Sequence, residues 1–258
     1  MLLSDIDIRR HLETGAVVID PFREEHLQNV SYDLTLGPYF WRYAWPRVDP
    51  QEPDGPVNMV RPHEEELEYH LVDARGLTGI PLDPGERVLG HSVEFAGGTI
   101  GHRRPRSPGE ASRAYQDGRD GAVPVAVTTH LQATSTAARI GVTACMCAGW
   151  GDVGFINRWT FEIENRRRDR LFLPVGAVIA QLVFEEVTPP SRIYSAKGNY
   201  QSATELDELK RAWKPEDMLP KRMKVREWRE AFDGQDDDPE ARPGRGDDQG
   251  RLRGAVAE

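Results

Sequence analysis

Hydrophobic and polar residues alternate along much of the chain between residues 15 and 194, which is the period of strands that bury one face. The clearest example is residues 158–164. Its apolar residues share one parity and its polar residues share the other: Trp159, Phe161 and Ile163 against Arg158, Thr160, Glu162 and Glu164. By its period alone, Glu162 is a solvated residue on the polar face, because Glu is seldom buried. The alternative is a general base in a pocket, and the period does not decide between the two.

The same pattern predicts further short strands, separated by turns that contain Gly or Pro. They cover residues 17–19, 32–36, 88–94, 125–131 and 177–185, and residues 171–176 are predicted to form the turn before the last of these strands. A helix is predicted over residues 4–14, where Ser4 can cap the first turn and Gly15 ends the last. Its partial apolar face would consist of Ile6, Ile8 and Leu12. Short strands with few helices predict an all-β fold, either a sandwich or a barrel.

One helical turn is predicted just after residue 134. Ser135 or Thr136 is a natural N-cap, two alanines favour the helix, and Gly141 ends it. The free backbone N–H groups at such a start favour an anion, and Arg139 lies one turn further along. An ordinary capped turn explains the same residues, so both interpretations stay open.

Two stretches show neither the period of a strand nor that of a helix, and they are predicted to be loops. Residues 45–66 are rich in Pro, Asp and Glu, and residues 97–123 form a long insertion rich in Gly, Arg, Ser and Pro. The basic part of the insertion, residues 102–106, is either a surface loop or a lid that offers Arg to a phosphate.

The composition changes after residue 203. Residues 205–213 and 223–232 are expected to form short helices, and residues 233–258 are charged and expected to be disordered. We therefore expect one domain over residues 1–203 and a C-terminal extension over residues 204–258.

Charge and composition narrow the class of protein. The 258 residues carry a formal net charge of −9, which argues against broad binding to nucleic acid or to an anionic membrane. No apolar run approaches the roughly 18 residues of a membrane helix, and the first residues lack the pattern of a secretory signal. We therefore expect a cytoplasmic protein without nucleic-acid or membrane partners.

The two cysteines and one acidic run raise the question of a metal site. Cys145 and Cys147 stand one residue apart without a nearby His or second Cys pair, so small apolar strand residues are the simpler interpretation. His63 begins an acidic run that is similar to a zinc-protease motif, but position 67 is Leu where the second His is needed. We expect no protein-bound metal.

Several motifs, taken in order, resemble the dCTP deaminase branch of the trimeric dUTPase superfamily. They are residues 3–8, 19–22 and 31–34, the turn at residues 135–141, and the run at residues 148–165. Residues 174–185 and 194–201 resemble the family's last strand and the C-terminal segment that covers the nucleotide. The spacing from Arg139 through Trp150 to Glu162 fits the family without a gap.

The resemblance implies a distorted jelly-roll or β-barrel subunit in a homotrimer, with sites where subunits meet. It also implies hydrolytic deamination of dCTP to dUTP and ammonia without zinc, with Mg²⁺ carried by the triphosphate. Glu162 is then the catalytic base that activates water, while Ser135 and Arg139 organise the phosphates and that water. The expected nucleotide contacts are Thr134, Ser135, Thr136, Arg139, Ala148, Trp150, Asp152, Thr160, Phe161, Tyr194, Tyr200 and Gln201. The His-x-Glu…Pro-Cys-x-x-Cys pattern of zinc deaminases does not occur in the sequence.

The sequence departs from the family pattern at four positions. These are Thr134 where Arg is usual, Cys145 where His is usual, Asn199 where Lys is usual, and Ala203 where a second Gln is usual. Lost cationic contacts weaken triphosphate binding, since each charge-assisted hydrogen bond contributes about 1.5–3 kcal/mol.

Two other functions therefore stay open, a dUTP diphosphatase of the same superfamily and a non-catalytic nucleotide-binding trimer. A diphosphatase of this superfamily normally has an Asp and a Tyr in the strand that enters the third sequence motif. The corresponding residues of this chain, 154–159, contain neither.

Overall fold

We describe a computed structural model of the chain that covers residues 1–43, 62–64, 66–119, 121–194, 198–201 and 203–224. The chain divides into two compact units. The first contains residues 1–60 and 66–221, and the second contains residues 61–65 and 222–258. Within the second unit, the backbone N–H of Met223 donates to the carbonyl of Pro62. None of the described helices is long and apolar enough to cross a membrane.

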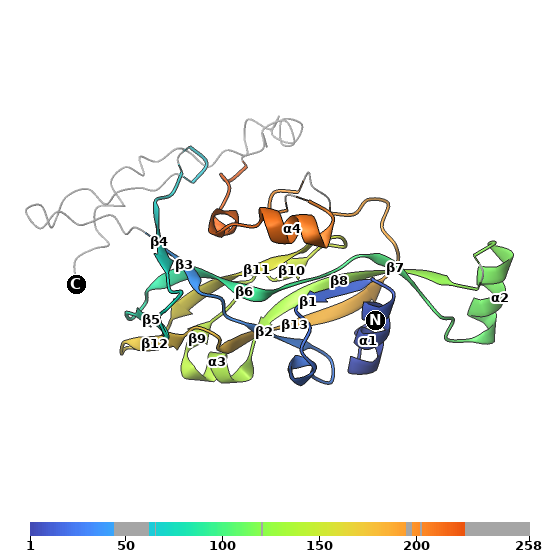
Figure 1. Ribbon diagram of the computed structural model, residues 1–258, viewed down its shortest axis with the longest axis horizontal. Coiled ribbons are helices and arrows are strands. Elements are labelled where there is room, and N and C mark those ends of the chain that lie inside the picture. The colour runs from blue at the N-terminus through green and yellow to red at the C-terminus, as the bar shows by residue number, and fades with distance from the viewer. Residues whose placement is uncertain (44–61, 65, 120, 195–197, 202, 225–258) are drawn as a thin grey trace, which may run out of the picture. The chain divides into compact units, whose positions relative to one another are not determined.

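The first unit is built mainly from antiparallel strands (Figure 1). One sheet has the order β4-β3-β6-β11-β9, with β1 also paired to β6. Its strands are β1 (Val17–Asp20), β3 (Tyr39–Tyr43), β4 (Tyr69–Asp73), β6 (Arg87–Gly98), β9 (Val142–Thr143) and β11 (Ile156–Asn165). The other large sheet has the order β10-β8-β13-β2, with β7 also paired to β8. Its strands are β2 (Tyr32–Thr35), β7 (Ile100–Arg103), β8 (Val123–Ala133), β10 (Trp150–Gly151) and β13 (Val178–Val187).

The remaining elements are short. A third, two-stranded sheet joins β5 (Gly79–Leu82) to β12 (Leu171–Pro174). The helices are α1 (Asp5–Glu13), η1 (Glu24–His26), α2 (Pro108–Gln116), α3 (Ser135–Ile140), α4 (Leu206–Ala212) and η2 (Pro215–Met218). The prediction of a mainly β protein with a few short helices is confirmed.

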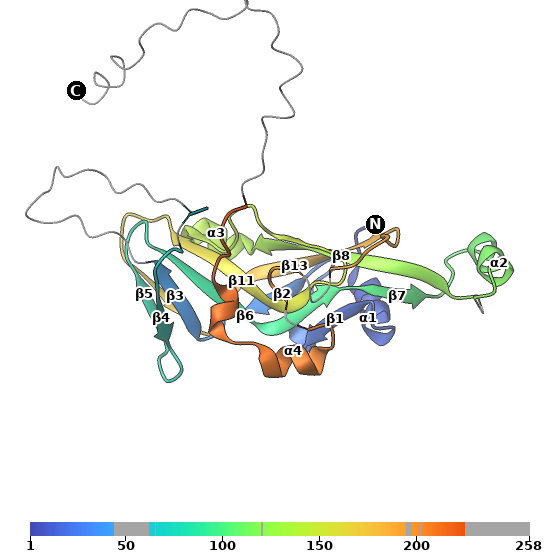
Figure 2. The same ribbon diagram turned by 90° about the horizontal axis from the view of Figure 1, so that it is seen from above.

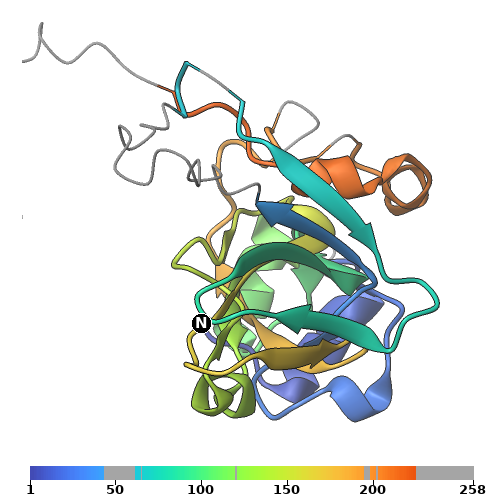
Figure 3. The same cartoon turned by 90° about the vertical axis from the view of Figure 1, so that its left-hand side faces the viewer.

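The two large sheets enclose one hydrophobic core (Figures 2 and 3). Phe161 and Ile163 of β11 point into it from one sheet, and Leu182 and Phe184 of β13 point into it from the other. All four side chains are at most 1% exposed. This is the arrangement expected of a jelly roll or barrel, in which alternate residues of each strand face inward.

Helix α1 follows the sequence prediction at both ends but not on its exposed face. The Ser4 hydroxyl accepts a hydrogen bond from the Asp7 backbone N–H, and Gly15 adopts φ +76° just after the helix. Ile8 is fully buried, whereas Ile6 is 56% exposed. The predicted apolar face was therefore wrong at Ile6, because His11 takes part of the buried stripe instead.

The insertion predicted as a structureless loop over residues 97–123 is instead largely regular. Strand β6 runs on to Gly98, and β7 pairs with β8 as an antiparallel hairpin. Helix α2 lies in the connection between these two strands, at the tip of the hairpin (Figure 1). Arg103 donates to Glu110 and to Glu186, and Arg106 donates to Glu186. These two arginines stabilise the insertion itself, which does not support their use as a phosphate lid.

The C-terminal segment packs on the first sheet. Helix α4 was predicted over residues 205–213, and its Leu209 is 1% exposed against Phe95 and Ile156. Trp41 donates its indole N–H to the carbonyl of Pro215, 2.7 Å away. The domain boundary expected at residue 203 stays a prediction, and the compact unit continues to Lys221.

Three sequence predictions fall mainly on residues outside the described ranges. They are the loop at residues 45–66, the helix at residues 223–232 and the disordered tail at residues 233–258.

Candidate active site

Strand β11 fixes the side of the sheet on which Glu162 lies. Glu162 stands opposite Leu89 of β6, and Glu164 stands opposite Arg87. Because directly opposed residues share a face, all four side chains lie on the outer face of the sheet. Ile163 stands between Glu162 and Glu164 in sequence and is buried in the core on the other face of the strand.

A register shift between β6 and β11 precedes Glu162. Arg158 pairs with Phe95, whereas Thr160 pairs with His91, so β6 carries extra residues at this point. Ser92 stabilises the irregularity, because its hydroxyl accepts a hydrogen bond from the Trp159 backbone N–H at 2.8 Å. The same hydroxyl donates to the carbonyl of Glu94 at 2.6 Å.

The Glu162 carboxylate is held by the loop that follows β9. The Met146 backbone N–H donates to Glu162 Oε2 across 2.8 Å. Thr143, the last residue of β9, donates its hydroxyl to the Glu162 carbonyl at 3.2 Å. The side chain is half-buried, so it is fixed in place and still open to a ligand or to water.

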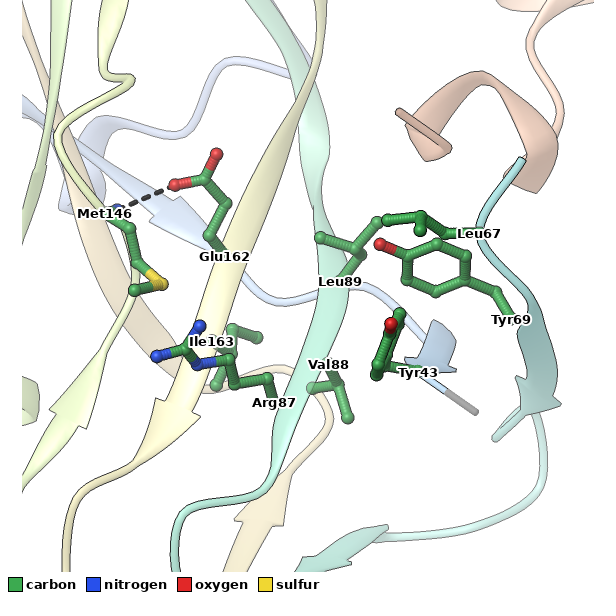
Figure 4. Close-up of a pocket in the computed structure, with 9 residues that line it drawn as sticks. All are labelled: Tyr43, Leu67, Tyr69, Arg87, Val88, Leu89, Met146, Glu162 and Ile163. Carbon is green, nitrogen blue, oxygen red and sulfur yellow. Dashed lines mark hydrogen bonds between the residues drawn. The ribbon is translucent and has the colours of Figure 1, made fainter. Parts of the chain in front are cut away.

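Glu162 lines a pocket of about 390 Å³ (Figure 4). This volume lies in the range of pockets that take small molecules. The lining is mostly apolar with a few polar groups: Tyr43, Leu67, Tyr69, Arg87, Val88, Leu89, Met146, Glu162 and Ile163. Such a pocket suits a flat heterocycle with a small number of hydrogen-bonding groups.

Two tyrosines form one side of the pocket. The rings of Tyr43 and Tyr69 meet edge to face with their centroids 5.5 Å apart. Figure 4 shows both on the far side of Leu89 from Glu162. Burial raises the pKa of the Tyr69 phenol, so this hydroxyl stays protonated at neutral pH.

Helix α3 carries the predicted phosphate-binding residues on its surface. Its N-cap is Thr134 rather than Ser135 or Thr136, because the Thr134 hydroxyl accepts from the Ala137 N–H at 3.2 Å. Gly141 ends the helix with φ +95°, as predicted. Ser135, Thr136 and Arg139 are exposed and do not line the Glu162 pocket.

A second cavity, of about 430 Å³, contains three further predicted contacts, Trp150, Asp152 and Tyr194. Trp150 is 59% exposed and stands edge to face with His130 at 4.0 Å. Ala148 is exposed on the preceding loop. The structure of a single chain therefore brings Trp150, Asp152 and Tyr194 together, but in a different cavity from Glu162.

The remaining predicted contacts lie on strand β11 or in the C-terminal segment at residues 200–201. Thr160 is half-buried on the outer face of β11, and the Phe161 side chain is fully buried, so only the Phe161 backbone can meet a ligand. Gln201 accepts from the Ile156 N–H and donates to the Gly154 carbonyl. Tyr200 is 41% exposed, and its backbone N–H donates to the Tyr194 hydroxyl. These hydrogen bonds anchor the C-terminal segment on the same chain.

The cysteines are not in a strand, contrary to the sequence interpretation. Strand β9 ends at Thr143, and Cys147 adopts φ +72° in the loop that follows. Both thiols are free, and burial raises the pKa of the Cys145 thiol. Among the residues that the structure describes, no three His, Cys, Asp or Glu side chains are grouped so that they could hold a metal ion.

Sequence reasoning missed most of the pocket lining. Tyr43 and Tyr69 belong to β3 and β4, and a long stretch of chain separates them from each other and from Glu162. Arg87 follows a turn and resembles any surface charge in the sequence. The signal that could have found Arg87 is the pairing of β6 with β11, which single-sequence periodicity does not supply.

Comparisons with known proteins show which family the chain is similar to. The sequence model of a family described as dCTP deaminase-like matches residues 2–102 and 121–187. The chain is 30% identical over 196 residues to "dCTP deaminase, dUMP-forming" of Acidothermus cellulolyticus, covering 74% of this chain and 83% of that protein. It is 29% identical over 196 residues to the protein of the same name from Methanobrevibacter smithii, covering 74% and 84%.

Among solved structures, the chain is similar to the 2'-deoxycytidine 5'-triphosphate deaminase of Agrobacterium tumefaciens. The TM-score is 0.43 at 15% sequence identity. The match covers 72% of this chain and 48% of the Agrobacterium chain, about half of its length.

Proposed function

The chain belongs to the dCTP deaminase-like family, and from that premise we propose that it hydrolytically deaminates dCTP with Glu162 as the base. The observation that carries the proposal is the position of Glu162. Its carboxylate is oriented by the Met146 N–H at the side of a mostly apolar pocket of about 390 Å³. A carboxylate in such a pocket can activate one water beside a bound pyrimidine.

The reaction needs one proton acceptor that later becomes a donor. Water adds to C4 of the cytosine ring while Glu162 takes a proton from that water. The protonated Glu162 then gives this proton to the ring nitrogen N3, and the resulting tetrahedral carbon loses its amino group. The amino group leaves as ammonia after it takes up the proton of the new C4 hydroxyl, which becomes the carbonyl of uracil. The Met146 N–H keeps the carboxylate in place through both transfers.

A homotrimer is part of the proposal. Within one chain, Glu162 lines one cavity, Trp150 and Asp152 line another, and Ser135 lines neither of the two. A site completed by residues of a neighbouring copy would join these groups around one nucleotide. Ser135, Thr136 and Arg139 are exposed on α3 and accessible to such a partner.

A second product is favoured by the names of the relatives. Both relatives described above are named dUMP-forming. Applied to this chain, that name implies a further hydrolysis that releases pyrophosphate after ammonia. We therefore carry dUMP plus pyrophosphate as the alternative to dUTP as the final product.

The proposed chemistry uses no zinc. Its support is the set of donors available, because the described residues contain no cluster of three candidate ligands. The same set offers no carboxylate cage for Mg²⁺, so we expect that ion to be bound by the phosphates of the nucleotide. No step of the deamination is assigned to it.

One experiment separates the candidates. The purified full chain is incubated with dCTP, dCMP or dUTP, and ammonia and pyrophosphate are measured separately, with Glu162→Gln in parallel. Ammonia from dCTP that is lost in the variant supports the proposal, and pyrophosphate in addition identifies the dUMP-forming activity. Pyrophosphate from dUTP alone indicates a diphosphatase. Bound nucleotide without either product contradicts an enzymatic function on these substrates.

A further inference from the structure

The loop that orients Glu162 carries both cysteines of the chain, one on either side of Met146. Both thiols are free, and Cys145 is half-buried whereas Cys147 is exposed. Cys145 stands where the family pattern usually has His, so the pair is not part of that pattern. The Met146 N–H donates to Glu162 Oε2 at 2.8 Å (Figure 4). The peptide that orients the carboxylate therefore lies directly between two oxidisable groups.

Both ends of this loop are fixed by backbone hydrogen bonds to strands. The Leu131 N–H donates to the Gly149 carbonyl at 2.7 Å, and the Glu162 N–H donates to the Ala144 carbonyl at 3.3 Å. The Gly149 end is also tightly packed, because an added Cβ there would lie 2.4 Å from the Leu131 carbonyl oxygen. A covalent change between the two ends must therefore be absorbed by the residues around Met146.

The two cysteines are near enough to be joined by a local change of the loop. Residues two apart have Cα atoms at most about 7 Å apart, and disulfides span roughly 4.4–6.8 Å. The chain bends at Met146 and at Cys147, which brings the flanking residues closer than in an extended strand. Burial raises the pKa of the Cys145 thiol, and so do the nearby charge of Glu162 and, to a smaller extent, that of Cys147. The exposed Cys147 is therefore the thiol that reacts first.

We propose that Cys145 and Cys147 are a modification site, which hydrogen peroxide oxidises to an intrachain disulfide that withdraws the Met146 N–H from Glu162. Its effect on activity rests on the function proposed above, in which Glu162 is the base. Formation of the disulfide does not depend on that function. A ring closed over a single intervening residue is strained, and strained or exposed disulfides are easily reduced. The modification is therefore reversible by thiols.

The oxidation has two steps. The Cys147 thiolate attacks one oxygen of the peroxide, the O–O bond breaks, and Cys147 becomes a sulfenic acid while hydroxide leaves. The Cys145 thiol then gives up its proton and attacks the Cys147 sulfur. The S–O bond breaks, and the second hydroxide leaves as water with the proton from Cys145. Two thiols and one hydrogen peroxide thus give one disulfide and two molecules of water, with the peroxide as the electron acceptor.

The test follows the thiols and the Met146 amide in the full chain. Reduced protein is treated with hydrogen peroxide, free thiols are blocked with N-ethylmaleimide, and the intact mass is measured with and without dithiothreitol. Because the chain has only two cysteines, a monomer that takes up no maleimide until it is reduced contains the Cys145–Cys147 disulfide. Hydrogen exchange at the Met146 amide reports its bond to Glu162 without turnover. Cys147→Ser is the matched control for oxidation elsewhere, including at methionine.

We expect the Met146 amide to exchange about 10-fold faster in the oxidised chain, which is the effect of losing one charge-assisted hydrogen bond. Ammonia release from dCTP should fall by roughly 10- to 100-fold, since a small misplacement of a catalytic group has an effect of this size. Dithiothreitol should restore both readouts. Cys147→Ser should give the same exchange and ammonia release before and after peroxide.

Three results would overturn the proposal. The first is peroxide-treated protein without the intrachain disulfide. The second is a disulfide that leaves the exchange of the Met146 amide unchanged. The third is an equal loss of ammonia release in Cys147→Ser, which would assign the loss to oxidation at other residues. A reduced chain that does not deaminate dCTP but forms the disulfide and shows the change in exchange would contradict the proposed function alone.

Discussion

Met146 donates its backbone N–H to Glu162 Oε2 across 2.8 Å, so the carboxylate of a strand residue is oriented by a loop. This contact leaves Glu162 Oε1 for water or substrate, because none of the hydrogen bonds described for Glu162 uses it. The catalytic proposal depends on this arrangement. Without the hydrogen bond from Met146, the whole Glu162 carboxylate would rotate freely, as on any exposed glutamate.

Glu162→Gln should abolish most of the deamination. The amide keeps the size of the side chain but cannot accept the proton of water, and general bases contribute roughly 10²- to 10⁴-fold to rates. We expect that loss in ammonia release, with the thermal midpoint nearly unchanged because Glu162 is only half-buried. Glu13→Gln, at an exposed position of α1, should behave like the unmodified chain. Full ammonia release by Glu162→Gln would exclude Glu162 as the base.

The strand that carries Glu162 was predictable from its sequence, and its pocket was not. Trp159, Phe161 and Ile163 repeat with a period of two, and all three are buried. That local pattern places Glu162 on the outer face without any knowledge of the fold. Tyr43 and Tyr69 reach the same pocket only through the pairing of β3 with β6 and β4, which depends on contacts between distant parts of the chain.

The insertion shows a second limit of sequence patterns. Residues 108–116 form α2, although their sequence has no long apolar stripe. Ser107 caps the helix through the Glu110 N–H, and Ala114 is its buried residue. A nine-residue helix with one buried side chain gives almost no periodic signal. It is stabilised by Arg103 and Glu110, whose contact is not visible in a hydrophobic pattern.

Trp213→Ala should detach the C-terminal segment from the sheet. The Trp213 ring lies 4.8 Å from the His91 ring, and the Arg158 guanidinium lies 4.8 Å from the Trp213 ring. Loss of the apolar area and of the cation–π contact should lower the free energy of unfolding by roughly 2 kcal/mol. Urea denaturation measures this. Trp150→Ala, where the ring is 59% exposed, should cost clearly less. Equal effects of the two substitutions would show that Trp213 does not stabilise the segment.

The buried His91 should make the protein less stable in mild acid. Burial, with a smaller effect of the nearby Arg158, lowers the pKa of His91 from 6.5 to about 4, and the side chain is 0% exposed. Between these two values the unfolded chain binds a proton that the folded chain does not, so stability falls as the pH falls. The contribution is fully present above pH 6.5 and is lost progressively toward pH 4. The total is about 3 kcal/mol, since one pKa unit corresponds to about 1.4 kcal/mol.

Urea denaturation at several pH values between 7.5 and 4.5, which spans about the titration range of His91, checks this dependence. His91→Gln removes the titrating group and should flatten the part of the curve below about pH 6.5 relative to the unmodified chain. If both proteins lose stability in parallel, other groups are responsible for the acid sensitivity.

Gly154→Ala should disturb the turn before β11 and the segment that rests on it. Gly154 adopts φ +96°, which side chains rarely allow, and an added Cβ would lie 2.5 Å from the Tyr194 carbonyl oxygen. Because the clash is with backbone, either the turn or the segment at Tyr194 must move, and we expect a loss of more than about 1 kcal/mol. Gly109→Ala is the matched control, since its Cβ would meet only the Ser107 hydroxyl at 3.9 Å. We expect faster hydrogen exchange at the Tyr194 amide, which donates to the Val153 carbonyl at 2.7 Å, in Gly154→Ala only. Equal hydrogen exchange at the Tyr194 amide in both variants would show that Gly154 is not needed to hold the Tyr194 segment against the turn.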